Sequence, residues 1–290
     1  MSMKGMVSRL FDRPLTAHKG DFGRVGVLAG SLSMLGAASL TAQSALRMGS
    51  GLVYVYSHEG IKEVLKDVPE LLVFPVISGN SDVDLKQIQA FITEHRVGVL
   101  AIGPGLGNTG YTRELVQGVL EMVREDDIQV VVDADGLNVS NVAIFKQRPS
   151  GSLVLTPHVG EFRQLFPDFS DKIDDSIEVR KRLALEASKQ CSQVVVLKGH
   201  RSVVAYDGDV YVNETGNPAM ATAGMGDVLT GMIASLCGQG FTGFDAAIVG
   251  VYLHGFGADR VEKECSIGLL ASDVVQCLPG MLATLRDTLD

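Results

Sequence analysis

The chain has 290 residues, and its 25 lysines and arginines against 34 aspartates and glutamates give a formal net charge of −9. A composition of 46% hydrophobic and 20% charged residues excludes a disordered chain, and the length fits one large α/β domain or two small ones with a buried core. The acidic balance argues against a general binder of nucleic acids or of membrane surfaces.

Seven short apolar segments are expected to form strands. In chain order they are Val25–Ala29, Leu52–Tyr56, Leu71–Val76, Val97–Ile102, Ile128–Val132, Leu153–Leu155 and Val194–Leu197. They mostly lack polar alternation, which is typical of parallel strands that helices cover on both faces. The helices expected between them are Leu35–Met48, Leu85–His95, Tyr111–Arg124 and Ile177–Lys189. This alternation predicts right-handed βαβ units and a three-layer α/β fold with a mostly parallel central sheet.

The later part of the chain departs from this alternation. Ser202–Tyr206 and Val210–Asn213 flank the dipeptide Asp207-Gly208, a pattern that predicts a small β-hairpin. Three helices are expected after it, over Asp227–Cys237, Asp245–Lys263 and Ser272–Thr288. Since no repeat, linker or low-complexity stretch interrupts the chain, we expect one domain over residues 1–290.

The cysteines and the N-terminus bear on the cellular compartment. The four cysteines, Cys191, Cys237, Cys265 and Cys277, show neither CxxC nor metal-finger spacing. The N-terminus has no apolar signal region, and no run of about 18 apolar residues occurs that could span a membrane. We therefore expect reduced thiols and a cytoplasmic protein.

Small, polar and charged residues follow five of the expected strands. These segments are Gly30-Ser31, Gly103–Gly107, Asp133–Asn138, Thr156–His158 and Lys198–His200. Ligands of open α/β sheets bind outside the carboxyl ends of the strands. The five segments are therefore expected to form the rim of one cleft.

The segment over residues 216–231 is the most informative. Gly224 and Gly226 come directly before an apolar helix, where exposed backbone N–H groups and the helix dipole favour a phosphate. Asp227 would lie at the edge of that phosphate, where it could take a proton from an attacking hydroxyl. The alternative is that Asp227 caps the helix and the glycines only shape a turn.

Three other strand ends carry residues with more than one interpretation. Asp133 and Asp135 could hold Mg²⁺ through water near a polyphosphate, or Asp135 or Asn138 could cap a helix. His158 could hydrogen-bond a polar ligand, or Thr156 could be the cap of the next helix with Glu161 supporting its first turn. The turn from Lys198 to Ser202 suits the phosphates or base of a nucleotide, and its alternative is a solvated basic turn.

Two better-known nucleotide motifs fit poorly. Residues 105–110 match GxGxxG, but Asp133 comes 28 residues after Gly105 and the strand is not the first, so a nicotinamide dehydrogenase is disfavoured. The same stretch has P-loop spacing with Tyr111 in place of the lysine, which disfavours a P-loop NTPase. His254 lies on an apolar helix and is interpreted as a packed core histidine.

Taken together, these segments resemble the ribokinase-like superfamily and, within it, the ADP/ATP-dependent NAD(P)H-hydrate dehydratases. The resemblance runs from about His18 to the C-terminus. The blocks that carry it are HKGDFGRVGVLAGS (18–31), GPGLG (103–107), DADGLN (133–138), LTPHVGEF (155–162), LKGH (197–200) and GNPAMATAGMGDVLTG (216–231). The family usually has Gly at the position of Ala219 and Thr at that of Met225, but a hole built from main-chain N–H groups does not depend on the side chain of Met225.

The resemblance implies a repair reaction by a hydro-lyase. Its substrate would be (S)-NAD(P)H-hydrate, which is NADH or NADPH that has gained water across the nicotinamide ring. With Mg²⁺ present, ADP or ATP would phosphorylate the ring hydroxyl, and phosphate would then leave to restore the double bond. A chain without a targeting peptide leans towards ADP. Relatives are often homotetramers, and they pair with an epimerase for which this chain has no room.

The resemblance also implies roles for particular residues. Asp227 would be the base, and the turn that stabilises the transferring phosphate would be Gly224, Met225 and Gly226. The nucleotide would contact Lys198, Gly199, His200, Arg201, Ser202 and Gly226. The hydrate pocket would be lined by Ala38, Gly105, His158 and Asp227.

Two rival functions use the same cleft. A kinase of a small vitamin precursor, such as a thiazole or pyrimidine alcohol, would use Asp227 and the same anion hole but release a stable phosphorylated product. A nucleotide sensor would keep the cleft without turnover. The HKG and TPH blocks favour the dehydratase over the kinase.

Overall fold

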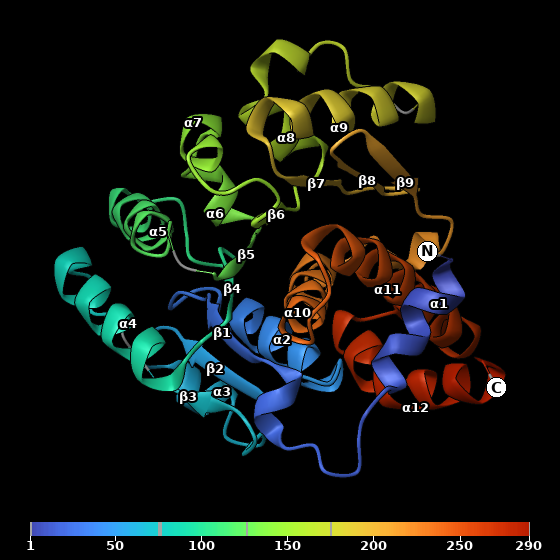
Figure 1. The fold of residues 1–290 in the computed structure, drawn as a ribbon, viewed down its shortest axis with the longest axis horizontal. Helices are drawn as coiled ribbons and strands as arrows, with labels where there is room; N and C mark the ends of the chain where they lie inside the picture. Colours follow the sequence, from blue (N-terminus) through green and yellow to red (C-terminus); the bar gives the residue numbers. More distant parts are fainter. Residues whose placement is uncertain (1, 75–76, 126, 175, 290) are drawn as a thin grey trace.

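A nine-stranded sheet runs through the middle of the protein (Figure 1). The computed structural model describes residues 2–74, 77–125, 127–174 and 176–289. The strands are β1 (Arg24–Leu28), β2 (Leu52–Tyr56), β3 (Leu72–Val73), β4 (Val99–Ile102), β5 (Gln129–Val132), β6 (Leu153–Leu155), β7 (Val194–Leu197), β8 (Val203–Tyr206) and β9 (Asp209–Val212). Their order in the sheet is β3-β2-β1-β4-β5-β6-β7-β8-β9.

The sheet is parallel from β3 to β7 and antiparallel only at one edge. Strands β1 to β7 pair in parallel, as in the register of Val25 with Val53 and with Val99. Strands β8 and β9 form the expected hairpin, which pairs antiparallel with β7. The expected third strand, Leu71–Val76, is wrong in extent, because β3 covers only two residues; positions 75 and 76 lie outside the described residues.

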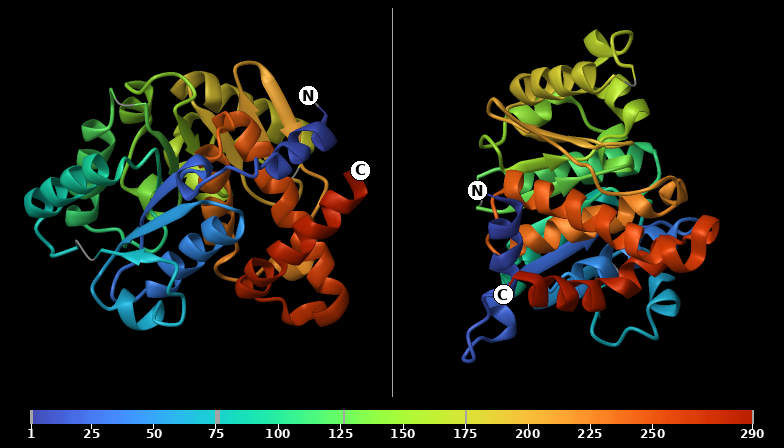
Figure 2. Two further views of the ribbon diagram at one scale, coloured as in Figure 1. Left: turned by 60° about the horizontal axis from the view of Figure 1, so that its bottom comes forward. Right: turned by 90° about the vertical axis from the view of Figure 1, so that its right-hand side faces the viewer.

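Helices cover both faces of the sheet, and Figure 2 shows the sheet between them. One layer consists of α4 (Ser81–His95), α5 (Gly110–Met122), α6 (Asp135–Asn138), α7 (Val142–Lys146), α8 (Val159–Leu165) and α9 (Ile177–Cys191). The other consists of α1 (Met3–Ser8), α2 (Leu35–Arg47), α3 (Ile61–Val64), α10 (Met225–Gly238), α11 (Gly243–Cys265) and α12 (Ala271–Leu289). The predicted three-layer arrangement is confirmed.

The two helical layers explain why the strands are apolar along their whole length. In β5, Val131 packs into the core on the α10 side, while Val130 and Val132 pack into the core on the α5 side. Both faces of a strand are thus buried, which removes the polar alternation of a half-exposed sheet.

Helices α2 and α10 pack closely beneath the sheet. A Cβ on Gly231 would lie only 2.0 Å from the carbonyl oxygen of Thr41, so only glycine allows this approach. The contact fixes α10, whose Thr230 donates to Asp133 directly after the carboxyl end of β5. In the described part of the chain, no helix is both long and apolar enough to cross a bilayer.

Candidate active site

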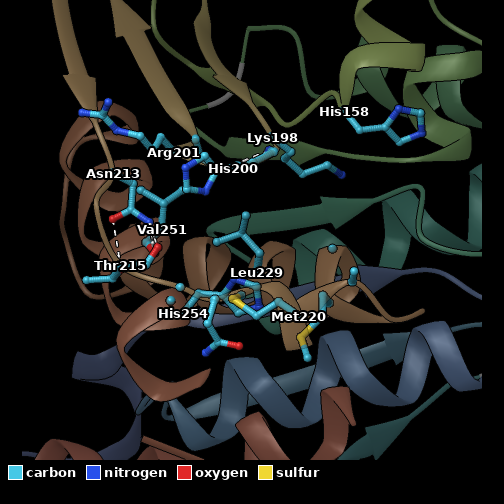
Figure 3. Close-up of a pocket in the computed structure, with 18 of the residues that line it drawn as sticks. His158, Lys198, His200, Arg201, Asn213, Thr215, Met220, Leu229, Val251 and His254 are labelled. Carbon is cyan, nitrogen blue, oxygen red and sulfur yellow. Dashed lines mark hydrogen bonds between the residues drawn. The ribbon is translucent and has the colours of Figure 1, made fainter. Parts of the chain in front are cut away.

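A cavity of about 680 Å³ opens at the carboxyl ends of β5, β6 and β7. Its walls are the turn after β7, the start of α10, the segment after β9 and part of α11 (Figure 3). The lining residues are Asp133, Ala134, His158, Glu161, Lys198–Ser202, Asn213, Thr215–Pro218, Met220, Ala221, Met225–Asp227, Leu229, Val251, His254 and Gly255. Three of the five predicted rim segments therefore meet in this cavity, whereas Gly30-Ser31 and Gly103–Gly107 are not among its lining residues.

Lys198 lies at the centre of the charged groups. Its Nζ donates to Asp133 Oδ1 at 2.5 Å and lies 3.8 Å from Glu161 Oε2. Burial alone would lower the pKa of Lys198, but the carboxylates of Asp133, Glu161 and Asp227 outweigh burial and raise it. The lysine is therefore a permanent cation at the cavity wall.

Asp133 is a buried residue whose two carboxyl oxygens both accept hydrogen bonds. Oδ1 accepts from Lys198, and Oδ2 accepts from the hydroxyl of Thr230 at 2.8 Å. The residue is 1% exposed, so its charge depends on these two donors. Asp133 orients Lys198 and ties the end of β5 to α10.

The N-terminus of α10 lies where the sequence predicts an anion hole. Gly224 precedes the helix with φ of 90°. The first N–H groups of a helix have no intrahelical acceptors, and here no side chain caps them either. A Cβ on Gly226 would lie 3.3 Å from Lys198 Nζ, which shows how near the helix start is to the cation. The interpretation of Asp227 as the helix cap is wrong, because Gly224 holds the cap position.

Asp227 stands in the first turn of α10 and faces the cavity. Burial raises its pKa to about 7, and the charges of Asp133 and Asp135 add to this effect, whereas Lys198 opposes it. A carboxyl group with a pKa near neutrality is suited to accept a proton and release it. The expected position of a general base is thus occupied by a group with fitting acidity.

Asp135 has a structural partner outside the cavity. Its Oδ2 accepts from the N–H of Gly107 at 2.8 Å, which joins the loop after β4 to the turn after β5. The cap position of α6 is Ala134, so the interpretation of Asp135 as a cap is wrong. Among the described residues, no group of three or more His, Cys, Asp or Glu side chains could hold a metal ion.

His158 caps α8 and also lines the cavity. Its Nδ1 accepts from the N–H groups of Gly160 and Glu161 at 2.9 and 3.2 Å, and Glu161 Oε2 accepts from the N–H of His158 at 2.7 Å. The alternative with Thr156 as the cap is therefore wrong. Because Nδ1 accepts two bonds, Nε2 is the ring nitrogen left to meet a ligand, and it lies 3.5 Å from Glu161 Oε1.

Ala38 and Gly105 lie together, but not among the residues of this cavity. Ala38 is fully buried on α2, and a Cβ added to Gly30 would lie 2.9 Å from the Cβ of Ala38. A Cβ on Gly105 would lie 2.8 Å from the Cβ of Ala37. Both residues belong to the junction of β1, α2 and the loop after β4.

The turn from Lys198 to Ser202 lies on the cavity wall as expected. Ser202 Oγ donates to the carbonyl of Gly199 at 3.0 Å, which closes the turn. Arg180 of α9 donates to the carbonyls of Leu197, Lys198 and His200 and holds the turn from behind. Gly199 and His200 are exposed and the side chain of Arg201 is 40% exposed, so the alternative of a solvated basic turn stays open.

Sequence reasoning missed several residues of the site. The sequence suggests Glu161 only as helix support and His254 only as a core residue, although both line the cavity. Burial and then Lys198 lower the pKa of His254 to about 4, so its ring is neutral. Asn213 and Thr215 also line the cavity, and only the unusual density of polar residues before Gly216 could have indicated them.

Comparison with known proteins decides the family. A family model described as NAD(P)H-hydrate dehydratase matches residues 25–280. The chain belongs to the NAD(P)H-hydrate dehydratase family. It is 36% identical over 266 residues to the ADP-dependent (S)-NAD(P)H-hydrate dehydratase of Neisseria meningitidis, and the match covers 89% of this chain and 84% of the relative.

Structural comparison agrees with this family. The Bacillus subtilis ADP/ATP-dependent NAD(P)H-hydrate dehydratase, co-crystallized with ATP/Mg²⁺, matches with a TM-score of 0.81 and 32% identity over 98% of this chain and 97% of that one. A solved ribokinase-like superfamily protein of Enterococcus faecalis shares the fold with a TM-score of 0.81 at 24% identity, covering 98% of this chain and 95% of that one, which confirms the predicted fold class.

Some family members are much longer than this chain. It is 37% identical over 295 aligned positions to the bifunctional NAD(P)H-hydrate repair enzyme Nnr of Moorella thermoacetica, covering 98% of this chain but 53% of that protein. The chain thus spans about half the length of several curated relatives that it matches.

Proposed function

We propose that this member of the family dehydrates (S)-NAD(P)H-hydrate to NAD(P)H at the expense of a nucleoside phosphate. The observation that carries the proposal is the position of Asp227, which shares the first turn of α10 with the N–H groups after Gly224 and faces the same cavity as Lys198. An acceptor hydroxyl and a phosphoryl group can meet there.

The first step would be phosphoryl transfer. The ring hydroxyl of the hydrate loses its proton to Asp227, its oxygen forms a bond to the terminal phosphorus, and the bond from that phosphorus to the nucleotide breaks. The N–H groups of Met225, Gly226 and Asp227, together with Lys198, would stabilise the charge on the transferring group.

The second step would be elimination. The ring C–O bond breaks with inorganic phosphate as the leaving group, and loss of a proton from the neighbouring carbon restores the ring double bond. Phosphate leaves far more readily than hydroxide, which explains why a kinase-type site can serve a dehydratase. His158 is placed to meet a polar group of the bound hydrate through its Nε2.

The nucleotide would lie along the turn from Lys198 to Ser202. This turn offers a cation at one end and the side chains of His200 and Arg201 further along the wall (Figure 3). We propose ADP as the donor with ATP as an alternative, in keeping with the names of the Neisseria and Bacillus proteins. Ala38 and Gly105 stay predicted contacts of the hydrate.

Magnesium would be held mainly by the phosphates of the nucleotide. Asp133 is engaged by Lys198 and Thr230, and Asp135 by Gly107, so these carboxylates fit a metal only through water. Bound Mg²⁺ would neutralise phosphate charge.

Partners and assembly follow from the same proposal. The bifunctional name of the Moorella protein suggests that a second activity accompanies this one, and we propose functional pairing with an NAD(P)H-hydrate epimerase. A homotetramer in the cytoplasm is the assembly and location that we expect. Sedimentation or light scattering would give the subunit number.

The direct test uses hydrated NADH, Mg²⁺ and either ADP or ATP. We expect the absorbance of reduced nicotinamide to return with one or both nucleotides and to stay absent without nucleotide or with the Asp227→Asn variant. No return with either nucleotide would contradict the proposal. A phosphorylated product that keeps its phosphate would instead indicate a kinase of the vitamin-precursor type.

A further inference from the structure

One wall of the cavity is a short strap, residues 213–221, that connects β9 to the segment before α10. Most of its residues line the cavity beside those of α11. The strap ends shortly before Gly224, so its position also bears on the start of α10. The contacts that hold the strap against α11 therefore help to set the shape of the cavity in which we propose that the nucleotide binds.

The strap is bound to α11 by side chains that reach backbone groups. Asn213 Nδ2 donates to the carbonyl of Val251 at 3.2 Å, and Thr215 Oγ1 donates to the carbonyl of Tyr252 at 2.8 Å. The approach is close, because a Cβ on Gly255 would lie 2.4 Å from Thr215 Oγ1. These bonds fix the first part of the strap.

The turn of the strap is held by a single carboxylate on α11. Asp259 Oδ2 accepts from the N–H of Gly216, and Asp259 Oδ1 accepts from Nδ2 of Asn217, both at 2.9 Å. Asn217 Oδ1 in turn accepts from the N–H of Ala219 at 3.0 Å. Asp259 does not itself line the cavity, but Gly216 and Asn217 do.

The chemistry explains why this position carries a carboxylate. Both groups that face Asp259 are donors, so the residue must offer two acceptors, and a carboxylate does so where an amide offers one. Gly216 has φ of 102°, a conformation that the bonds to Asp259 help to hold.

We infer that Asp259 is a positioning residue for nucleotide binding, and that it acts through Asn217 on the cavity wall. The inference rests on the proposed use of a nucleotide. Asp259 holds the strap in the form that receives the nucleotide, so its loss should weaken nucleotide binding more than it slows the chemical step.

The test exchanges the two side chains. In Asp259→Asn an amide NH₂ meets the NH₂ of Asn217, and in Asn217→Asp two carboxylates face each other. In the double variant, the amide introduced on α11 would accept from the N–H of Gly216 and donate to the carboxylate introduced on the strap. That carboxylate would still accept from the N–H of Ala219, so every bond is restored. The net charge of the double variant equals that of the parent.

We expect each single variant to weaken binding of ADP by about tenfold or more in calorimetry, and the double variant to recover to within about threefold of the parent. The KM for the hydrate should change little. The control is Asp245→Asn, which removes a surface carboxylate of α11 that lies 4.0 Å from Arg9, and it should bind ADP like the parent.

Two results would overturn the inference. One is unchanged ADP affinity in Asp259→Asn, and the other is failure of the double variant to recover. Because calorimetry with ADP needs no hydrate, these results are separate from the activity assay. If the ADP affinity depends on Asp259 but no NADH is restored, only the proposed reaction is contradicted. If the parent protein binds neither ADP nor ATP, both the reaction and the inference are contradicted.

Discussion

Asp227 combines a raised pKa with a position in the first turn of a helix. Burial and neighbouring carboxylates keep its pKa at about 7, while Lys198 and the helix dipole favour an anion beside it. A group with these properties can alternate between acid and base near neutral pH, whereas an exposed aspartate would stay ionised.

The first residue-scale prediction concerns Asp227→Asn. The amide keeps the shape but cannot take a proton, so we expect kcat to fall by about 10²–10⁴-fold while ADP affinity changes little. Steady-state kinetics of the variant alongside calorimetry would measure both. A variant with a near-parental kcat would rule out Asp227 as the base.

The pH dependence provides a second prediction. The pKa of Asp227 is raised from 3.8 to about 7. Because only the ionised form accepts a proton, kcat/KM should rise with pH and level off above about 7. An acid limb that persists unchanged in the residual activity of the Asp227→Asn variant, or one centred near 4, would contradict this assignment.

The same shift has a consequence for stability. A carboxyl group whose folded pKa lies above its unfolded value favours the folded state only at low pH, and this contribution is lost as the pH rises from about 4 to about 7. Asp227→Asn should therefore stabilise the protein at pH 8, by an amount on the order of 2 kcal/mol, and little at pH 4. Urea unfolding at both pH values would show it.

At the scale of the element, the contact between α2 and α10 sets the position of the anion hole. Gly231→Ala would place a Cβ 2.0 Å from the carbonyl of Thr41 and push the helices apart. We expect it to destabilise the protein by about 3 kcal/mol or more. The denaturant midpoint would measure the loss.

Gly280 is the matched control on α12. A Cβ there would meet no heavy atom of the described residues within 4 Å. Gly280→Ala should therefore leave stability unchanged or raise it by about 0.5–1 kcal/mol. Equal losses in the two variants would contradict the role of close packing at Gly231.

Elements and site differ in how far the sequence predicts them. The strand β7 and the hairpin after it follow from a run of valines and from Asp207-Gly208, which are local signals. Lys198 and Asp133 are each visible as polar residues at strand ends, but their ion pair joins positions 65 residues apart. Only the order of strands β5, β6 and β7 brings them together, and no local pattern encodes that order.

The strap shows the same limit. Asn217 and Asp259 look like ordinary polar residues of a loop and a helix, and their bond spans 42 residues. The sequence predicts that His158 lies at the start of a helix. That the same residue caps α8 and also lines the cavity follows only from the fold, which places His158 beside Lys198 after β7.

At the scale of the whole molecule, the two cores share one continuous sheet. The residues of β5 contribute to both cores, so neither helical layer can unfold without exposing the other face of the same strands. We expect a single domain over residues 1–290 with one cooperative unfolding transition. Far-ultraviolet circular dichroism and tyrosine fluorescence should give coincident curves, and two separate transitions would contradict the single domain.

The buried position of Asp133 has a consequence for biosynthesis. Its two donors, Lys198 and Thr230, come 65 and 97 residues later in the chain. At a translation rate of about 5–20 residues per second, a nascent chain that has already emerged as far as β5 waits about 5–20 s before both donors have been made. During that interval the half-built sheet cannot close over the carboxylate, and the ribosome-bound intermediate is the form on which a chaperone would act.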